Sequence, residues 1–323
     1  GNFEKAIEIL RERGLATAAK KASRTAAEGM VYADYCPECK VGVVIEVNAE
    51  TDFVAKNENF REFVRGLLET IIAHKPADVD ALKACKYKDT DLTVEDKMKE
   101  MIFTIGEKLD LRRFVIVDGT TSTYIHGGGA IGVIIKFEAD DAAKNNAGFA
   151  EFAKNIALQT AAYPVEYLNR EAVPASRIAE EREIIKSQID NDEKNAKKPE
   201  QIKEKMVDGK IGKFYEKNCL TEQAYVKDDS VSVGQYVENT AKEFGGHIAV
   251  VGFVRYEKGE GIQNDGIFMW YAPYKDPEVA IFVVVERGGA GADVQFIARH
   301  IMDAYITIMG YSDTSETEMT LLK

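Results

Sequence analysis

The sequence predicts an α+β protein built on a duplicated strand-loop-helix core of two subdomains with antiparallel sheets. We expect three additions to this core: an N-terminal helix, an inserted antiparallel helical hairpin, and a C-terminal β-hairpin plus helix. A strand-helix pattern recurs about ninety residues along the chain, and a charged stretch carries narrow apolar stripes at helical spacing. The chain has 323 residues, of which 45% are hydrophobic, enough to bury a core in two or more domains.

The N-terminal residues predict a short helix followed by a basic linker. Apolar residues recur at helical spacing from Phe3 to Leu10, and Gly14 is expected to end this helix. Residues 16–27 mix Ala with Lys and Arg, so we interpret them as a basic helical linker. Because the chain starts at Gly1 without an initiator Met, we expect it to be a fragment that lacks residues upstream.

An internal repeat supplies the predicted core. Residues 41–50, Val-Gly-Val-Val-Ile-Glu-Val-Asn-Ala-Glu, match residues 131–140, Ile-Gly-Val-Ile-Ile-Lys-Phe-Glu-Ala-Asp. Both segments are rich in β-branched and apolar residues, as is typical of buried strands. Each is followed by Ala-Lys-Asn and then by a helical apolar pattern that ends at Pro76 or Pro164. We therefore expect the same strand-loop-helix unit to occur twice.

The loop between strand and helix differs between the two copies. The first copy contains Glu50-Thr51-Asp52-Phe53-Val54, whereas the second is two residues shorter and contains Asp140-Asp141-Ala142. A Phe required by the core would be expected in both copies, so Phe53 is a candidate for contact with a partner. The spacing also allows Phe53 to be a core residue that covers a helix end, and both alternatives stay open.

Shorter patterns predict the remaining elements. Apolar residues at coiled-coil spacing on either side of Lys197-Lys198-Pro199 predict an antiparallel helical hairpin, an arm over residues 176–218. A helix is expected at Glu238–Phe244 and a strand at His247–Tyr256. Two further strands, Phe268–Tyr271 and Glu278–Val285, are joined by a turn over residues 272–277 and followed by a helix at Val294–Met309.

Charge and motif patterns exclude several classes of function. The net charge of -12 argues against a nucleic-acid coat and against an anionic membrane surface, because both favour clustered cationic side chains. No apolar run is long enough to cross a bilayer and no secretory signal is present, so we expect a cytoplasmic protein without direct nucleic-acid or membrane binding. Phosphate-binding glycine motifs and nucleophile motifs are absent, so we expect no catalytic residue and no cofactor.

One cysteine pair has the spacing of metal ligands. Cys36 and Cys39 form a CxxC pair, but a structural zinc site needs four ligands and no second pair follows. We therefore favour a tight turn between two strands over a zinc site and expect no bound metal.

Residues 3 to about 262 resemble bacterial translation elongation factor Ts. The resemblance is carried, in family order, by residues 42–57, Gly106–Phe114, Tyr124–Gly127, Pro199–Ile202 and Gly209–Ile211. It implies a guanine-nucleotide exchange factor of translation elongation, which is not an enzyme because it makes and breaks no covalent bond. Its partner would be elongation factor Tu, in the GDP-bound and nucleotide-free forms. GDP would be released because the factor disturbs the magnesium and phosphate site of that partner.

The resemblance also implies the contact residues of the first repeat. Phe53 would insert between helices of the partner's nucleotide domain, and Asp52 would disturb the surroundings of the bound magnesium. Thr51 and Val54 belong to the same contact loop.

The second repeat supplies further candidate contacts through the same resemblance. Ile131 and Gly132 match a second contact site at the start of the repeat strand. Gln159 stands where the family often has a His on the following helix; its amide can hydrogen-bond to a partner but does not titrate. We therefore include Gln159 among the predicted interface residues.

The C-terminal segment resembles a different family. Trp270–Tyr274, Pro277–Gly289 and Ile297–Tyr305 are similar to the last strands and final helix of a penicillin-binding transpeptidase domain. The chain lacks the SxxK, SxN and KTG motifs that the activity of that fold requires. The alternative function is therefore a transpeptidase-related or inactive hybrid protein. A partial sheet exposes apolar edges unless it docks on the first body or on another copy, so self-association is left open.

These patterns divide the chain into four parts. We expect residues 1–30 to be the remnant of an N-terminal helical domain with its basic linker, 31–137 the core N-subdomain, 138–262 the core C-subdomain with the helical arm 176–218, and 263–323 a transpeptidase-like C-terminal fragment.

Overall fold

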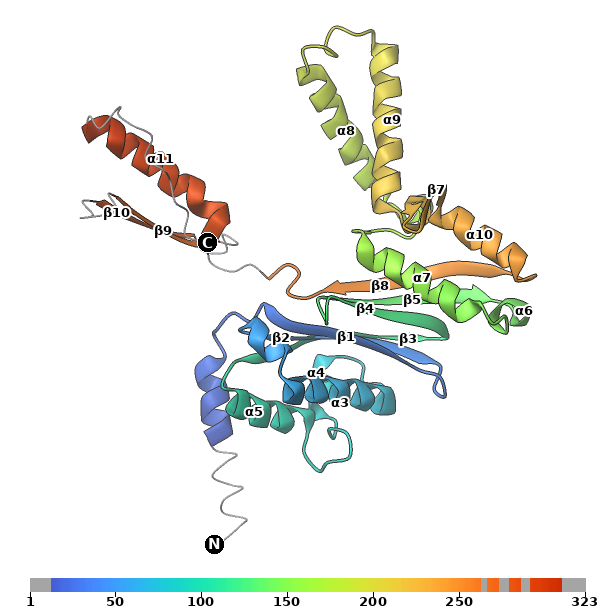
Figure 1. The fold of residues 1–323 in the computed structure, drawn as a ribbon, viewed down its shortest axis with the longest axis vertical. Helices are drawn as coiled ribbons and strands as arrows, with labels where there is room; N and C mark the ends of the chain where they lie inside the picture. Colours follow the sequence, from blue (N-terminus) through green and yellow to red (C-terminus); the bar gives the residue numbers. More distant parts are fainter. Residues whose placement is uncertain (1–12, 263–265, 273–278, 286–290, 310–323) are drawn as a thin grey trace. The chain divides into compact units, whose positions relative to one another are not determined.

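The chain divides into two compact units, Gly1–Glu260 and Gly261–Lys323. A computed structural model describes residues 13–262, 266–272, 279–285 and 291–309 (Figure 1). Helices and small antiparallel sheets make up both units, which confirms the predicted α+β class. The predicted helical pattern from Phe3 to Leu10 and most of the predicted turn over residues 272–277 lie outside the described residues.

Within the described residues, the first unit contains two three-stranded antiparallel sheets. The first has the order β1-β2-β3, formed by Glu28–Cys36, Val41–Ala49 and Leu109–Asp118. The second has the order β4-β5-β8, formed by Thr120–His126, Ile131–Ala139 and Ile248–Glu257. The two repeated segments therefore both form strands, as the duplication predicts, and each is the central strand of its sheet.

The repeat extends to details of the central strands. The register shifts at the same repeat position in both, between Glu46 and Val47 in β2 and between Lys136 and Phe137 in β5. The second residue of each strand is glycine, Gly42 or Gly132. A Cβ atom on Gly132 would lie 2.4 Å from Cγ1 of Val31, and one on Gly42 would lie 2.8 Å from Oγ1 of Thr121. These glycines let the two sheets approach closely.

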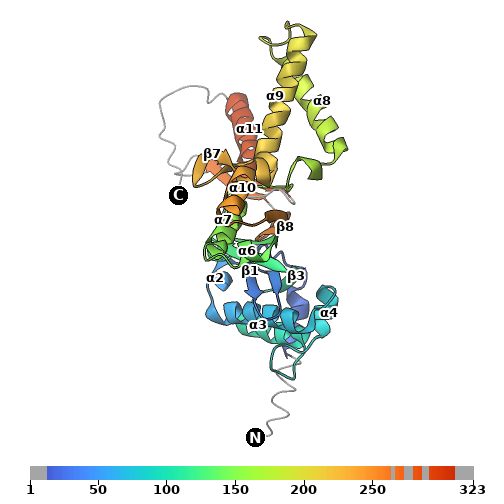
Figure 2. The ribbon, with the colours of Figure 1, turned by 90° about the vertical axis from the view of Figure 1, so that its right-hand side faces the viewer.

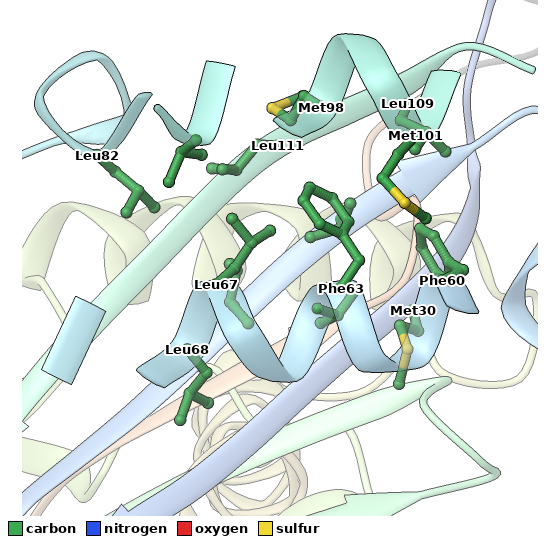
Figure 3. Packing of buried hydrophobic residues seen from close by; sticks show 14 of the residues in the cluster. Met30, Phe60, Phe63, Leu67, Leu68, Leu82, Met98, Met101, Leu109 and Leu111 are labelled. Carbon is green, nitrogen blue, oxygen red and sulfur yellow. The ribbon is translucent and has the colours of Figure 1, made fainter. Parts of the chain in front are cut away.

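The two sheets stack between layers of helices (Figure 1). A small apolar cluster of Val31, Ala33, Val44 and Ile134 fills the space between the sheets. The outer face of the first sheet is covered by α3 (Glu58–His74), α4 (Val79–Ala84) and α5 (Val94–Ile105), whose packing Figure 3 shows. The second sheet is covered by α7 (Phe149–Ala162) and α10 (Val233–Glu243). Each helix therefore buries its apolar side against one sheet.

The helix α10 begins earlier than the sequence pattern predicts. The predicted helix starts at Glu238, whereas α10 starts at Val233. Ser232 and Gln235 form a reciprocal capping box, in which each side chain accepts a hydrogen bond from the other residue's backbone N–H. This cap satisfies two backbone N–H donors at the helix start, which allows α10 to begin about one turn before the predicted residue.

The inserted arm is an antiparallel pair of helices, α8 (Ala175–Asn191) and α9 (Glu200–Asn218). Figure 2 shows the pair extending away from the sheets. Its core is the apolar cluster of Ile185, Ile189, Val207 and Ile211. Short elements connect the arm to the second sheet: η1 (Arg170–Ala172), η2 (Leu220–Glu222), β6 (Ala224–Tyr225) and β7 (Asp228–Ser232).

The N-terminal helix differs from its prediction. Residues 13–21 are helical, so Gly14 lies within a helix, and the expectation that it ends one is wrong. Gly14 is buried, and a Cβ atom added there would lie 3.5 Å from the carbonyl oxygen of Lys99 in α5. This is an ordinary van der Waals distance, so the contact with α5 does not require a glycine. Ala18, in the predicted basic linker, packs on the core of the first sheet.

The C-terminal unit has the predicted hairpin and helix. Strands β9 (Gly266–Ala272) and β10 (Val279–Val285) pair antiparallel, and α11 (Gly291–Met309) follows. Ile281 and Val283 of β10 pack against Ala298 and Met302 of α11.

Candidate protein-binding site

The loop that distinguishes the two repeats carries an exposed aromatic ring. Residues Asp52–Ala55 form α2, a single helical turn between β2 and α3. Val54 is buried in the core of the first sheet, whereas Phe53 is 76% exposed. Among the described residues, Phe53 is the most exposed of the large apolar side chains. The alternative of a core role for Phe53 is therefore wrong.

Two glutamates brace this loop against the segment that precedes β3. Both carboxylate oxygens of Glu107 accept from Thr51, one from its backbone N–H at 2.9 Å and one from its hydroxyl at 2.7 Å. In the opposite direction, Glu50 accepts from the backbone N–H of Lys108 at 2.6 Å and forms an ion pair with Arg24 at 3.0 Å. Burial raises the pKa of Glu50, but these hydrogen bonds outweigh burial and keep it below its usual value.

The start of α3 fixes the other end of the loop. The side chain of Asn57 caps α3 by accepting from the backbone N–H groups of Asn59 and Phe60. The Arg61 guanidinium donates to the carbonyl oxygen of Ala55 at 2.8 Å. A helix of one turn is unstable in isolation, so the tertiary contacts on both sides define the conformation of α2.

Asp52 lies beside the ring on the exposed surface. Its carboxylate forms an ion pair with Lys56 at 2.8 Å, and this hydrogen bond lowers the pKa of Asp52 below its usual value. The Lys56 ammonium also lies 5.7 Å from the centre of the Phe53 ring. Because exposed ion pairs contribute little net stability, the Asp52 carboxylate can exchange Lys56 for another partner.

The second repeat lacks this arrangement. There, Asp140 caps the short helix α6 (Asp141–Lys144) by accepting from the backbone N–H of Ala143 at 2.9 Å. Its second oxygen accepts from the backbone N–H of His247 at 2.8 Å. The loop is thus closed by one aspartate, with no aromatic side chain in the turn. The first repeat alone presents a ring at this position.

The structure brings the start of β5 to the same end of the core as α2. Lys258 donates its backbone N–H to the carbonyl oxygen of Ala130 at 2.8 Å, and its ammonium pairs with Glu28. The same ammonium is near enough to Asp52 to lower its pKa further. Ile131, next to Ala130, is half-buried. The two predicted contact regions therefore share one end of the core of the first unit.

Three predicted contact residues lie inside the protein. Val54 anchors α2 in the core, and Gly132 lies in the contact between the sheets. Gln159 is 0% exposed: its amide N–H groups donate to Gln223 and to the carbonyl of Ala224, and its oxygen accepts from the N–H of Val226 at 2.7 Å. We therefore remove Gln159 from the candidate interface, because its polar groups are already paired within the chain.

A buried carboxylate that the sequence analysis did not single out lies in the middle of β2. Glu46 is 0% exposed and accepts from Arg112 at 3.0 Å, from Arg113 at 2.6 Å and from the backbone N–H of Gly259 at 2.8 Å. It ties the end of the first unit to the first sheet. The sequence feature that could have indicated this site is an acidic residue within an otherwise apolar strand.

The cysteine pair forms a turn, as predicted. Cys36 and Cys39 lie at the turn between β1 and β2, where the backbone N–H of Cys39 donates to Sγ of Cys36 at 3.2 Å. Across the described ranges, no group of three or more His, Cys, Asp or Glu side chains could hold a metal ion. Nor does any helix in these ranges have the length and apolarity to cross a membrane.

An exposed aromatic side chain on a braced loop, at one end of a core that also carries a helical arm, is an arrangement that suits a protein-binding factor. A family model described as Elongation factor TS matches residues 50–260. The chain is 44% identical to elongation factor Ts of Syntrophotalea carbinolica over 267 residues, which cover 82% of this chain and 86% of that protein. It is 43% identical to elongation factor Ts of Clostridium botulinum and 42% identical to that of Clostridium kluyveri, in each case over 82% of this chain and 85% of the relative. The chain belongs to the elongation factor Ts family.

This membership confirms the resemblance given by residues 3 to about 262. It assigns the chain to the translation factors of protein biosynthesis. These relatives give no support to the alternative of a transpeptidase-related protein.

Proposed function

We propose that this chain binds elongation factor Tu and promotes the release of GDP by inserting the Phe53 ring into the partner. As a member of the elongation factor Ts family, the chain has the role of a nucleotide exchange factor in translation elongation. The observation that carries the proposed mechanism is the 76% exposure of Phe53 on a loop that two glutamates hold in place.

An exchange factor acts through differential binding. It binds the nucleotide-free partner more tightly than the GDP-bound partner, and by linkage it weakens GDP binding by the same factor. A shift of about ten-thousand-fold needs roughly 5.5 kcal/mol of differential binding. Burying the exposed three quarters of a Phe side chain removes about 150 Å² from water, which contributes at most about 4 kcal/mol. Phe53 can therefore supply the largest single share, and further contacts must supply the rest.

The bracing of the loop adds to this contribution. A flexible loop loses conformational entropy when it binds, which reduces the net affinity. Here Thr51 is held by Glu107 and Val54 by the core before any partner arrives. The backbone that carries the ring is therefore held in place, and little ordering of the loop is left to the binding step.

Asp52 is the second group of the proposed mechanism. Like any Asp with a pKa at or below the usual value, it is ionised at neutral pH, and its partner Lys56 is on the exposed surface. An anion placed beside a magnesium site competes with the ligands of the metal. We assign this role to Asp52 and a contact at the same end of the molecule to Ile131.

The proposed partner states are the GDP-bound and the nucleotide-free forms of elongation factor Tu. The proposed reaction takes place in the cytoplasm and includes no covalent step. It requires neither a nucleic acid nor self-association of the chain. The similarity of residues 263–323 to a transpeptidase terminus stays a prediction and has no part in this function. The division of the chain into four domains also stays a prediction.

A stopped-flow measurement tests the proposal. Elongation factor Tu loaded with a fluorescent GDP analogue is mixed with the chain, and the rate of release is followed. Phe53→Ala is expected to lower the accelerated rate by roughly 30- to 150-fold, the equivalent of about 2 to 3 kcal/mol for an interface anchor. Because an exposed side chain supports little of the fold, the free energy of unfolding should change by less than about 0.5 kcal/mol.

The chain offers a matched control for this variant. Phe282 is also a strongly exposed Phe, but it lies outside the segment that matches the family. Phe282→Ala is expected to leave the release rate unchanged. Equal rates for Phe53→Ala and the unmodified chain would overturn the proposed mechanism.

A further inference from the structure

We propose that Glu107 is a positioning residue for nucleotide exchange, which holds Phe53 in the orientation that the partner meets. This inference rests on the proposed function of Phe53. Glu107 touches neither the ring nor, in the proposed mechanism, the nucleotide; it acts through Thr51, the residue immediately before α2.

The hydrogen bonds of Thr51 differ from those of a usual helix cap. At the start of a helix, a Thr side chain usually accepts a hydrogen bond from a backbone N–H of the first turn. At Thr51 this cap bond is absent, and the hydroxyl donates to Oε1 of Glu107 at 2.7 Å instead. The backbone N–H of Thr51 donates to Oε2 of the same carboxylate at 2.9 Å. Two charge-assisted bonds from one carboxylate fix both the backbone and the side chain of the residue.

Two attachments hold the start of the short helix α2, on either side of Phe53. Val54 inserts into the core on one side, and the Glu107 carboxylate holds Thr51 on the other. The ion pair between Asp52 and Lys56 lies within the exposed turn and does not tie it to the rest of the protein. Without Glu107, Thr51 loses both of its hydrogen bonds to the segment before β3, whereas the contacts of Glu50, Val54 and Ala55 remain. The start of α2, next to Phe53, can then shift. Such a shift redirects Phe53.

The loop after β2 and the segment before β3 each contribute a carboxylate that binds the other segment. Glu107 belongs to the segment before β3 and binds the loop after β2, whereas Glu50 belongs to that loop and binds the backbone N–H of Lys108. The Lys108 ammonium donates to the carbonyl oxygen of Arg24 at 2.8 Å, and Arg24 pairs with Glu50. The two segments are thus cross-linked by carboxylates that point in opposite directions.

A double-mutant cycle with release of fluorescent GDP from elongation factor Tu tests the proposal. Glu107→Ala is expected to lower the accelerated release rate about tenfold in the unmodified chain, since it removes two charge-assisted hydrogen bonds. In the Phe53→Ala background, at factor concentrations that keep release above the intrinsic rate, the same change should have an effect below about twofold. Glu107→Gln can accept from the backbone N–H of Thr51 through its amide oxygen and donate its N–H to the Thr51 hydroxyl oxygen, so it should restore most of the rate.

A control separates positioning from general loss of structure. Asp140 holds two backbone N–H groups in the corresponding loop of the second repeat, which has no ring to position. Asp140→Ala is expected to lower the melting temperature to a similar degree as Glu107→Ala while leaving the release rate unchanged. Thr51→Val, which removes the hydroxyl but retains the backbone N–H, provides a second variant if Glu107→Ala does not fold.

The outcomes are distinguishable. If Phe53→Ala does not slow release, the proposed function fails whatever Glu107 does. If Phe53→Ala slows release and Glu107→Ala is equally harmful with and without the ring, the positioning role is overturned. A loss of rate in Asp140→Ala equal to that in Glu107→Ala overturns it as well. Coupling between Glu107 and Phe53, together with rescue by Gln, supports it.

Discussion

Replacement of Glu46 is expected to destabilise the first unit strongly, although the residue lies within an apolar strand. Its carboxylate accepts from two guanidinium groups, from Asn48 and from the backbone N–H of Gly259. Glu46→Ala removes this shared acceptor, although Asn48, Arg112 and Arg113 each keep another. Removing one member of a buried ion pair typically costs about 3 to 5 kcal/mol, because the remaining charge is uncompensated.

The expected magnitude lies at the lower end of that range. The Arg112 and Arg113 side chains remain 23% and 29% exposed, so water can solvate part of their charge after the substitution. We therefore expect Glu46→Ala to lower the free energy of unfolding by about 3 kcal/mol. Glu46→Gln keeps an acceptor oxygen and the side-chain shape, so about half of that loss is expected.

Urea unfolding at neutral pH measures this difference, with Glu58→Ala as the control. Glu58 forms an ion pair with Arg65 at 2.9 Å in which both side chains are exposed, so its loss should cost less than about 1 kcal/mol. Equal losses for Glu46→Ala and Glu58→Ala would refute the reasoning, because burial would then make no difference to the value of the ion pair.

The pH dependence provides a second check on Glu46. Burial raises the pKa of Glu46, but its hydrogen bonds from Gly259, Asn48 and the arginines outweigh burial and hold the pKa below the ordinary value of 4.5. The folded-state pKa is therefore lower than the unfolded-state pKa. The stabilisation is fully present above the unfolded value and is lost as the pH falls through the folded value. The difference between the unmodified chain and Glu46→Gln should accordingly shrink in acid; a difference that grows would contradict the assignment.

Three further predictions concern packing, buried polar groups and cysteine reactivity. Gln159→Leu should lower the free energy of unfolding, measured in urea, by about 2 to 3 kcal/mol, because the buried partners of Gln159 lose their hydrogen bonds. GDP release should not slow at temperatures where this variant is folded. A slower release would return Gln159 to the interface. Gly132→Ala should lower the free energy of unfolding by about 1 to 3 kcal/mol, because the new Cβ would lie 2.4 Å from a side chain of the other sheet. By contrast, Gly209→Ala in α9 places its Cβ where no atom lies within 4 Å, so it should slightly raise the melting temperature. Cys219 is buried, and burial raises its pKa to about 11, so it should react slowly with thiol reagents. A disulfide reagent that absorbs on reaction should modify exposed Cys39 in the folded protein and Cys219 only after unfolding. Rapid modification of Cys219 in the native state would contradict this expectation.

Local patterns were sufficient for the repeated elements of the fold. The apolar runs that begin at Val41 and Ile131 became the central strands, and the helical patterns after them became α3 and α7. The arm was predictable because its stripes repeat over many residues on both sides of a turn. The short helix α4 and the helix α5 were not anticipated, and the start of α10 was missed because it depends on a cap at Ser232 rather than on apolar spacing.

The sequence by itself determined the repeat, the α+β class, the family, and the position at which the two copies differ. It did not determine which way Phe53 points, because Phe53 and Val54 are neighbours of similar apolarity and only packing decides which of them enters the core. It likewise placed Gln159 at an interface, although its hydrogen-bond partners are residues more than sixty positions away that close over it. The carboxylate that holds Thr51 comes from Glu107, 56 residues along the chain. Periodicity reports which residues share one face of one element, whereas the orientation of a single exposed ring is set by contacts between elements, and these form only when the chain folds.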